Sequence, residues 1–272
     1  MHQGRLEGRT AIVTGAGAAG DGIGNGRAIA MRLAREGALV LAVDREPSLV
    51  ERTQDMLRSE GADCAIFVAD VSIGAQVREM VQAATALTGR IDVIVNNVGI
   101  GVYGGPMELA EEDWDRVFAV NVKSMFLTAK YVLPVMLEQG KGSMVNVSSV
   151  ASIRSGPPPL LAYNASKAAV NALTQTIALE YAARGIRANA ILPGLINTPM
   201  VRKPLSHTGN DVEAAIAARG AICPTGAMGT GWDVASAALF LASDDASYIN
   251  GVLLPVDGGL TQQVIAPAAK AN

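Results

Sequence analysis

The sequence is poor in the side chains that metal centres and histidine-dependent hydrolases use. Its 272 residues include only two histidines, His2 and His207, and two cysteines, Cys64 and Cys223. A His-ligated metal site or a Ser-His-Asp triad has almost no material here, so we expect no metal. The cysteines lie far apart and form no CxxC, which is typical of a reduced, cytoplasmic protein.

Charge and long apolar runs are also scarce. Only 17% of the residues are charged, the net charge is −3, and no long basic run occurs, which argues against nucleic acid or a membrane as partner. No apolar run approaches the roughly 18 residues that span a bilayer. The first ten residues, MHQGRLEGRT, lack the apolar core of a secretory signal. A hydrophobic content of 50% instead predicts a folded domain with a large core.

What the sequence does contain is an alternation of short β-branched runs with helix-length amphipathic stretches. Continuous apolar strands between helices predict a single-domain α/β fold, a Rossmann-type doubly wound parallel sheet of about seven strands with helices on both faces. The expected strands are 10–14, 38–44, 64–70, 91–97, 144–149, 187–194 and 251–259. The expected helices are 26–37, 48–60, one ending near Gly89, 111–139 with an interruption or bend at Pro134, 161–184 and 232–242.

No linker and no second core are visible, so residues 1–272 are expected to form one domain with an ordered core at about 5–262. Residues 200–229 carry scattered Pro, Gly, His and Thr. They are expected to be irregular or weakly helical and to form a flap over a substrate pocket. Residues 263–272 are expected to form a loosely ordered tail.

A glycine-rich stretch, TGAGAAGDGIGNG, separates the first strand from the first helix. Glycines there let the backbone approach a pyrophosphate, while the helix N-terminus offers free N–H groups and a favourable dipole. Such loops often only make turns, but the strand–turn–helix context favours dinucleotide binding.

Asp44 ends the second strand. An acid at this place can accept hydrogen bonds from the adenosine ribose and repels a 2′-phosphate, although it can also be a simple helix cap. The neighbouring Arg45 could hold that phosphate. The position of the acid favours NAD over NADP.

Tyr163 and Lys167 stand four residues apart in YNASK, on one face of an expected helix. A free phenol, with a pKa of about 10, is a poor base at neutral pH, and a nearby ammonium lowers that pKa. A tyrosine so tuned can exchange a proton with an alcohol oxygen as hydride moves to or from a nicotinamide. Taken alone, however, Y-x-x-x-K more often marks two surface residues.

The surroundings favour the reactive interpretation. Ser149 ends the fifth strand at the carboxyl edge of the sheet, where α/β proteins bind ligands and where a serine can polarise a substrate oxygen. The segment NNVG, 96–99, ends the fourth strand at the same rim. Asn121 lies among apolar neighbours in a helix, where an amide costs stability unless it has partners.

Together these residues resemble the short-chain dehydrogenase/reductase family along nearly the whole chain. An ordered set of motifs of this length is far more specific than any single motif. The matching pieces are Thr14-Gly15, GRAIA at 26–30, Asp44, Asp70-Val71, NNVG at 96–99, Asn121, Ser149, YNASK at 163–167, PGLINTP at 193–199 and VDGG at 256–259.

The resemblance implies a role for each matching residue. Tyr163 would be the general acid/base, and Lys167 would hold the nicotinamide ribose and lower the pKa of the tyrosine. Ser149 would position the substrate oxygen, and Asn121 would keep a water for proton relay. Asp70 and Val71 would meet the adenine, Asn97 the adenosine or ribose side, and Ile196 and Thr198 the carboxamide. The full expected set for NAD is Gly15, Gly24, Asn25, Gly26, Asp44, Asp70, Val71, Asn97, Gly99, Tyr163, Lys167, Ile196 and Thr198. The family also implies a homotetramer or homodimer, built here through the helices that begin at 111 and 161.

Three features depart from the family pattern. Aligning TGxxxGxG on Gly24-Asn25-Gly26 leaves eight residues after Gly15, five more than usual, while Gly22-Ile23-Gly24 would break the register of the first helix. The gap from Ser149 to Tyr163 is 14 residues where the family commonly has 13, and Ser148 would need a longer one. The extra residue falls in GPPPLL beside the expected substrate pocket. Val98 replaces the usual alanine.

These observations favour an NAD-dependent oxidoreductase that interconverts a secondary alcohol and a ketone. The alternative is an NADPH-dependent carbonyl or 3-oxoacyl reductase, favoured if Arg45 rather than Asp44 faces the ribose. A non-enzymatic dinucleotide sensor would be expected to have lost Tyr163 or Lys167. The pocket walls predict a small, neutral, moderately hydrophobic substrate, although Arg154, Arg202 and Lys203 leave an anionic one open. The candidate contacts are Ile153, Pro158, Leu160, Met200, Leu205, His207, Ile216 and Met228.

Overall fold

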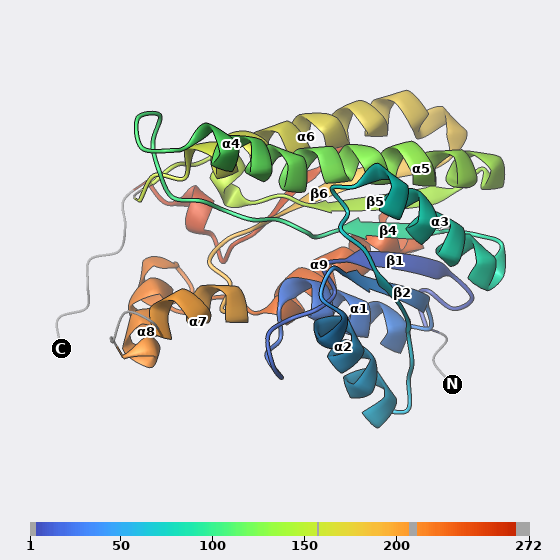
Figure 1. The fold of residues 1–272 in the computed structure, drawn as a ribbon, viewed down its shortest axis with the longest axis horizontal. Coiled ribbons are helices and arrows are strands. Elements are labelled where there is room, and N and C mark those ends of the chain that lie inside the picture. Colours follow the sequence, from blue (N-terminus) through green and yellow to red (C-terminus); the bar gives the residue numbers. More distant parts are fainter. Residues whose placement is uncertain (1–3, 157, 207–210, 265–272) are drawn as a thin grey trace.

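A parallel sheet forms the centre of the molecule (Figure 1). The computed structural model describes residues 4–156, 158–206 and 211–264. Within them the sheet has seven strands in the order β3-β2-β1-β4-β5-β6-β7, and every neighbouring pair is parallel. The order reverses at β1 and β4, which puts a topological switch point at their carboxyl ends. The strands are β1 (Thr10–Thr14), β2 (Leu39–Asp44), β3 (Ala65–Val68), β4 (Val93–Asn96), β5 (Gly142–Val147), β6 (Ile186–Pro193) and β7 (Leu253–Val256).

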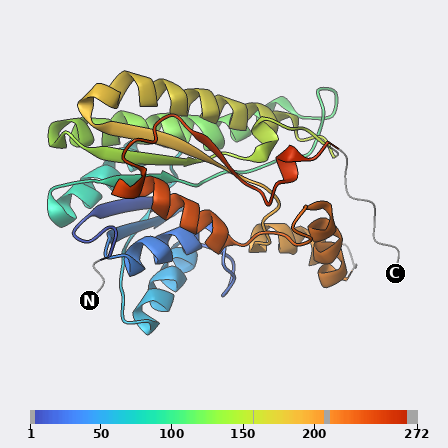
Figure 2. The same ribbon diagram turned by 180° about the vertical axis from the view of Figure 1, so that it is seen from behind.

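Helices cover both faces of this sheet. They are α1 (Asn25–Arg35), α2 (Pro47–Ser59), α3 (Gly74–Thr88), α4 (Glu111–Phe118), α5 (Ser124–Gln139), α6 (Leu161–Tyr181), α7 (Pro199–Ser206), α8 (Val212–Ile222) and α9 (Gly231–Ala242). Figures 1 and 2 show α1, α2 and α9 on one face, α3, α5 and α6 on the other, and α7 with α8 apart from both layers. The predicted α/β doubly wound fold is therefore confirmed.

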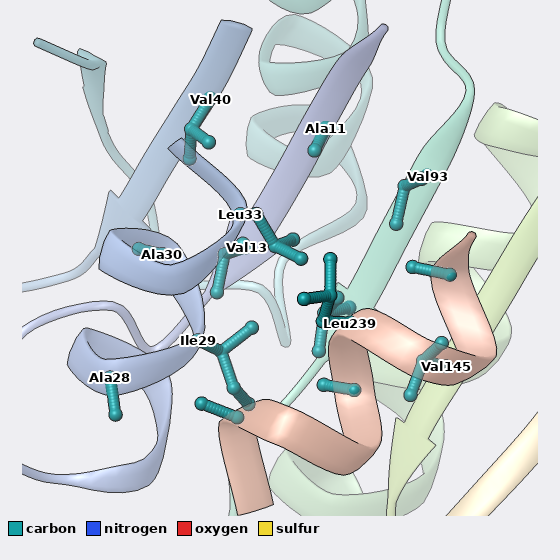
Figure 3. Packing of buried hydrophobic residues seen from close by; sticks show 14 of the residues in the cluster. Ala11, Val13, Ala28, Ile29, Ala30, Leu33, Val40, Val93, Val145 and Leu239 are labelled. Carbon is teal, nitrogen blue, oxygen red and sulfur yellow. The ribbon is translucent and has the colours of Figure 1, made fainter. Parts of the chain in front are cut away.

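The strands alternate their side chains between two apolar layers. In β1, Val13 joins the layer under α1 and α9, whereas Ile12 joins the layer under α3, α5 and α6. Figure 3 shows Ile29 and Leu33 of α1 and Leu239 of α9 gathered over this first layer. Burying one such side chain fully stabilises a fold by about 1.5–3 kcal/mol, so strands that are apolar on both sides require helices on both sides.

The long helical stretch from Glu111 to Gln139 departs from α geometry at a place other than the expected one. Between α4 and α5 the chain makes a π-helical turn, Ala119–Lys123, which contains Asn121. Pro134 lies inside α5 without interrupting it. Its ring is on the exposed side, where water can reach the carbonyl that the proline leaves unpaired.

The segment after β6 is more regular than its composition predicts. It forms α7 and α8 where irregular or weakly helical structure was expected. Asp211 begins α8 because its carboxylate accepts hydrogen bonds from the N–H groups of Glu213 (2.9 Å) and Ala214 (3.3 Å). The tail expected at 263–272 falls almost entirely outside the described residues.

A chain of buried hydrogen bonds fastens the carboxyl rim of β4 and β5 to α6. Asn96 Nδ2 donates to Asn146 Oδ1 (2.8 Å), and Asn146 Nδ2 donates to Thr174 Oγ1 (2.8 Å). Thr174 Oγ1 in turn donates to the Val170 carbonyl (2.7 Å). Because buried polar groups are costly when unpaired, this chain fixes the spacing between two strands and the helix that carries Tyr163.

This series of buried hydrogen bonds predicts that Asn146→Ala lowers the stability of the protein strongly. The substitution leaves the buried Asn96 amide without its acceptor and opens a small cavity, so the free energy of unfolding should fall by about 2–3 kcal/mol. Urea denaturation measures this. Thr176→Ala, which removes an exposed hydroxyl from the same helix, is the control and should change stability by less than about 0.5 kcal/mol. Equal losses in the two variants would contradict the proposed importance of the buried chain.

Candidate active site

Ser149, Tyr163 and Lys167 meet just beyond the carboxyl end of β5. Ser149 faces Tyr163 and is close enough to lower the pKa of the phenol. Lys167 is 2% exposed, and its Nζ donates to the carbonyl oxygen of Val147 (2.8 Å) and lies 5.7 Å from the centre of the Tyr163 ring. One turn of α6 therefore carries the phenol and the amine toward the same space.

The two adjacent serines have different tasks. Ser148 Oγ donates to the backbone carbonyl of Lys167 (3.1 Å), which fixes α6 to the end of β5. Ser149 Oγ accepts from the Ala151 N–H (3.1 Å) and faces Tyr163. The structure thus places Ser149, the serine chosen from the spacing, beside Tyr163.

Burial dominates the electrostatics of this pair. Removal from water raises the pKa of Tyr163 above its ordinary value, and the hydrogen bond with Ser149 acts in the opposite direction. Burial lowers the pKa of Lys167 to about 8, because a charged ammonium is poorly solvated there. Lys167 was expected to lower the pKa of the tyrosine, but in this structure the amine is bonded to the Val147 carbonyl and burial sets the raised pKa of Tyr163.

Asn121 is fully buried in the π-helical turn, and its amide ties that turn to two other segments. Its Oδ1 accepts from the Ile100 N–H (2.8 Å), and its Nδ2 donates to the Ile100 carbonyl (2.9 Å) and to Ser166 Oγ (2.9 Å). Both amide hydrogens are used, while Oδ1 keeps one free lone pair. Ser166 was missed in the sequence. Its position three residues after Tyr163 was the only signal.

The loop after β4 comes close to these side chains because it is rich in glycine. A Cβ on Gly99 would stand 3.0 Å from Lys167 Nζ. A Cβ on Gly101 would stand 3.5 Å from the Tyr163 ring and 3.7 Å from Leu160. Gly101, which the sequence did not single out, therefore borders the space in front of the phenol.

The turn between β1 and α1, residues 15–24, forms a glycine-rich cradle in front of the N-terminus of α1. Gly15 has φ +65°, and a Cβ on Gly26 would lie 1.9 Å from the Gly15 carbonyl oxygen, so the helix can approach the strand only with glycine at this place. Gly24 directly precedes α1, which begins at Asn25. This helix start fits the assignment of Gly24-Asn25-Gly26 as the closing trio.

The N-terminus of α1 has the properties of an anion site. Its first N–H groups have no acceptors within the helix, and the positive end of the helix dipole is directed outward. Asn25 Oδ1 is buried and has no hydrogen-bond partner; as an acceptor it can take a hydrogen bond from a bound group but cannot hold an anion. The free N–H groups at the start of α1 fit the diphosphate of a dinucleotide.

Asp44 closes the other side of this cradle. Its carboxylate accepts from the Gly17 N–H (3.0 Å) and from the Glu46 N–H (3.2 Å). Arg45 points away, with a side chain that is 67% exposed and 3.8 Å from the Glu46 carboxylate. Of the two neighbours, the acid and not the arginine contacts the glycine loop.

The remaining expected cofactor residues lie along the same carboxyl edge. Asn97 Nδ2 donates to the Gly15 (3.0 Å) and Thr14 (3.3 Å) carbonyls, so its amide holds the glycine turn. Asp70 Oδ1 accepts from the N–H (2.9 Å) and hydroxyl (2.6 Å) of Ser72, and Val71 is buried in the core.

Ile196 and Thr198 follow β6 and are both buried. Beside Ile196, Asn197 and Leu195 exchange hydrogen bonds with Gly229 (2.8 and 3.0 Å), which brings the two ends of the expected flap together.

The arginines near the expected pocket have partners. Arg154 Nη2 donates to the Thr261 carbonyl (2.9 Å), and Arg202 pairs with Glu213 (2.6 Å) and with Asn197 (2.8 Å). Met200 is 71% exposed. His207 and the side chains of Lys203 and Leu205 lie outside what the structure describes.

The described part of the chain contains no cluster of three or more His, Cys, Asp or Glu side chains that could hold a metal ion. None of the helices in that part is long and apolar enough to cross a membrane.

Comparison with known proteins places the chain among oxidoreductases. A family model described as enoyl-(acyl carrier protein) reductase matches residues 17–261. The chain is 39% identical to the 2-(S)-hydroxypropyl-CoM dehydrogenase 3 of Xanthobacter autotrophicus, covering 94% of this chain and 98% of that one. It is 40% identical to the 3-oxoacyl-(acyl-carrier-protein) reductase of Thermotoga maritima, over 94% and 99% of the two chains. A short-chain dehydrogenase/reductase from Burkholderia xenovorans has a similar crystal structure, with a TM-score of 0.93, 44% identity and coverage of 96% and 100%.

The buried amine generates a prediction about stability. Since the pKa of Lys167 is about 8 when folded and 10.5 when free, the unfolded chain binds the extra proton between these values, and the free energy of unfolding should rise with pH there. Relative to Lys167→Met, which does not titrate, wild type should gain about 2 kcal/mol between about pH 7.5 and about pH 9.5. Urea denaturation of both proteins across this range measures the difference. Parallel pH curves would show that the amine is not buried as described.

Proposed function

The chain belongs to the short-chain dehydrogenase/reductase family, and from this premise we propose that it is an NAD-dependent oxidoreductase interconverting a secondary alcohol and a ketone. The observation that carries the proposal is the meeting of Ser149, Tyr163 and Lys167 at the carboxyl end of β5, where the buried lysine is bonded to the Val147 carbonyl and lies against Gly99. A surface Y-x-x-x-K pair would be solvated and would not bond to the end of a core strand.

In the proposed reaction the chain's own residues bind the substrate and move a proton. Ser149 would donate to the substrate oxygen and hold it beside the Tyr163 hydroxyl, which gives a proton in ketone reduction and takes one in alcohol oxidation. Lys167 would bind the ribose nearest the reacting ring, and Asn121 would use its free Oδ1 lone pair to hold a water behind the lysine. When bound, the nicotinamide supplies the carbon that exchanges hydride with the substrate.

The cofactor would lie along the carboxyl edge of the sheet. The α1 N-terminus with Gly15, Gly24, Asn25 and Gly26 would hold the diphosphate, and Asp44 the adenosine ribose. Asp70 and Val71 would border the adenine. Asn97 and Gly99 would support the ribose side, and Ile196 and Thr198 the carboxamide. Preference for NAD is supported by the Asp44 carboxylate against the loop and by the outward Arg45.

The alternative is an NADPH-dependent carbonyl or 3-oxoacyl reductase. One of the similar proteins is named a 3-oxoacyl-(acyl-carrier-protein) reductase, and both reactions convert a ketone and a secondary alcohol into each other. The alternative would require Arg45 to leave Glu46 and turn toward the ribose. A binding protein without activity would have no need for the buried lysine.

The proposal includes a small, neutral, moderately hydrophobic substrate under a flap formed by residues 200–229. It also includes a homotetramer or homodimer, because α4, α5 and α6 expose Trp114, Phe126, Leu161 and Leu179. The proposal also includes a cytoplasmic location, because Cys64 and Cys223 are buried free thiols.

Removal of the phenol tests the chemistry. Tyr163→Phe should lower kcat for secondary alcohols by about 10²–10⁴-fold while leaving NADH binding intact, because only the proton transfer is lost. Tyr248→Phe, at a fully exposed tyrosine, is the matched control. Spectrophotometric assay of NADH measures both. Wild-type turnover by Tyr163→Phe would refute the assignment.

The proposed role of Tyr163 sets the direction of the pH dependence, and its raised pKa places the change at high pH. Alcohol oxidation needs the phenolate as base, so its kcat/KM should increase as pH rises toward the tyrosine pKa, whereas ketone reduction needs the phenol and should decrease. Ser149→Ala removes the one interaction that lowers this pKa and should shift the oxidation profile to higher pH. A profile that falls with pH would contradict Tyr163 as the base.

Cofactor preference tests the role of Asp44. Wild type should show a kcat/KM for NAD at least about tenfold above that for NADP, since the carboxylate repels a 2′-phosphate. Asp44→Asn keeps an oxygen for the Gly17 N–H but removes the charge. The ratio of kcat/KM for NAD to kcat/KM for NADP should therefore fall toward one. Arg45→Gln should leave it unchanged. Equal or better rates with NADPH in wild type would favour the alternative.

A further inference from the structure

A fully buried arginine lies beneath the lengthened glycine loop. Arg27, in the first turn of α1, is 0% exposed, and all five of its N–H donors have acceptors. Three of these bonds go to loop carbonyls: Nη1 donates to Gly20 (2.7 Å) and Gly22 (2.7 Å), and Nη2 donates to Ala18 (2.8 Å). The guanidinium thus binds every second carbonyl of the inserted segment.

The remaining donors fix the arginine to α2. Nε donates to Thr53 Oγ1 (3.0 Å), and Nη2 also donates to the Leu49 carbonyl (3.2 Å). The Thr53 hydroxyl itself donates to the Ala16 carbonyl (2.8 Å), which continues the pattern to the start of the loop. No carboxylate in the described residues forms a salt bridge with Arg27, whose hydrogen bonds all go to carbonyls and one hydroxyl; Asp21 and Asp44 act on its charge only from farther away.

The loop held by Arg27 extends along the proposed cofactor site from one end to the other. At its start, the Gly17 N–H is bonded to Asp44, which would hold the adenosine ribose. At its far end, Gly22 packs so closely on Pro199 that a Cβ there would stand 2.3 Å from the proline Cγ. Pro199 is the first residue of α7 and follows Thr198, which would meet the carboxamide.

We propose that Arg27 is a positioning residue that holds the loop of residues 17–23 as a rigid bridge between the dinucleotide site and the flap helix α7. The inference rests on the proposed function for the identity of the ligand, but the loop–flap contact is a property of the chain itself. A rigid loop presents its amides to the diphosphate without an ordering cost at binding, and its contact with Pro199 transmits its position to the flap.

The first test replaces the arginine without removing its charge. Lysine has three donors that form no planar fork, so Arg27→Lys should leave loop carbonyls unpaired and the loop mobile. NADH affinity, measured by fluorescence titration, should weaken by about tenfold or more. Arg35→Lys is the matched control, because that arginine is on the same helix, pairs with Glu60 and makes no contact with the loop.

Hydrogen exchange on the protein without cofactor separates this inference from the proposed function. In Arg27→Lys, the segments 16–24 and 199–206 should both exchange faster than in wild type, while β4 and β5 keep their protection. If wild type fails to bind NADH, the proposed function is wrong, and the exchange result still decides whether the loop and flap form one unit. Unchanged exchange in α7 would overturn the inference.

A second pair of variants does not disturb the buried arginine. Gly22→Ala should clash with Pro199 and weaken NADH binding. Pro199→Ala removes the ring atom and leaves the Ala19 carbonyl oxygen at 3.1 Å and the Cβ of residue 199 at 3.4 Å, contacts that a shift of a few tenths of an ångström relieves. The double variant should therefore bind NADH about as well as Pro199→Ala alone, a rescue that general destabilisation would not produce. Additive losses would show that the loop and flap act independently, as would wild-type affinity in Gly22→Ala.

Discussion

The contact between Gly26 and the Gly15 carbonyl is the constraint on which the rest of this site depends. With no Cβ at Gly26, α1 comes close enough to β1 for Ile29 and Leu33 to enter the core beside Val13. The same approach directs the free N–H groups of the helix toward the carboxyl edge of the sheet. Asn97 then holds the Gly15 carbonyl from the side of β4, so packing and the cofactor cradle share one set of atoms.

The reactive side chains are positioned mainly by bonds to the backbone. Lys167 is bonded to the Val147 carbonyl, Ser148 to the Lys167 carbonyl, and Asn121 to both polar groups of Ile100. Val147 is the last residue of a core strand, so its bond to Lys167 transfers the rigidity of the sheet to the amine, while the other bonds join α6 and the π-helical turn to their neighbours. The cost is a buried amine whose pKa is lowered to about 8 and a buried phenol whose pKa is raised. Such shifts are typical of sites where a proton has to move.

Much of the fold could be predicted because it follows from apolar periodicity. Strand β1 was predicted residue for residue, and the helices on each face agreed within a few residues. The π-helical turn could not be predicted, because it depends on the partners that Asn121 finds in Ile100 and Ser166. Proline propensity pointed instead to Pro134, which the exposed side of α5 tolerates.

The site could be predicted to the extent that its chemistry is local in sequence. Tyr163 and Lys167 share a helix face, and Ser149 and Asn97 follow strands whose ends must meet at one edge. Contacts between distant segments gave no such signal: Gly101 beside the phenol and Pro199 against Gly22 both depend on how loops fold over the sheet.

Arg27 shows how a departure in length can be absorbed by one side chain. In the sequence Arg27 is the second residue of GRAIA. An arginine in the first turn of a helix would be expected to reach solvent. The five additional residues after Gly15 bring carbonyl groups into the fold that no strand or helix can pair, and orphaned carbonyls are costly when buried. A guanidinium offers five donors in one plane and can serve several of them at once. Its unpaired positive charge lies behind the loop whose outer face would meet a diphosphate, so the arrangement that makes the insertion tolerable also favours an anion at that face.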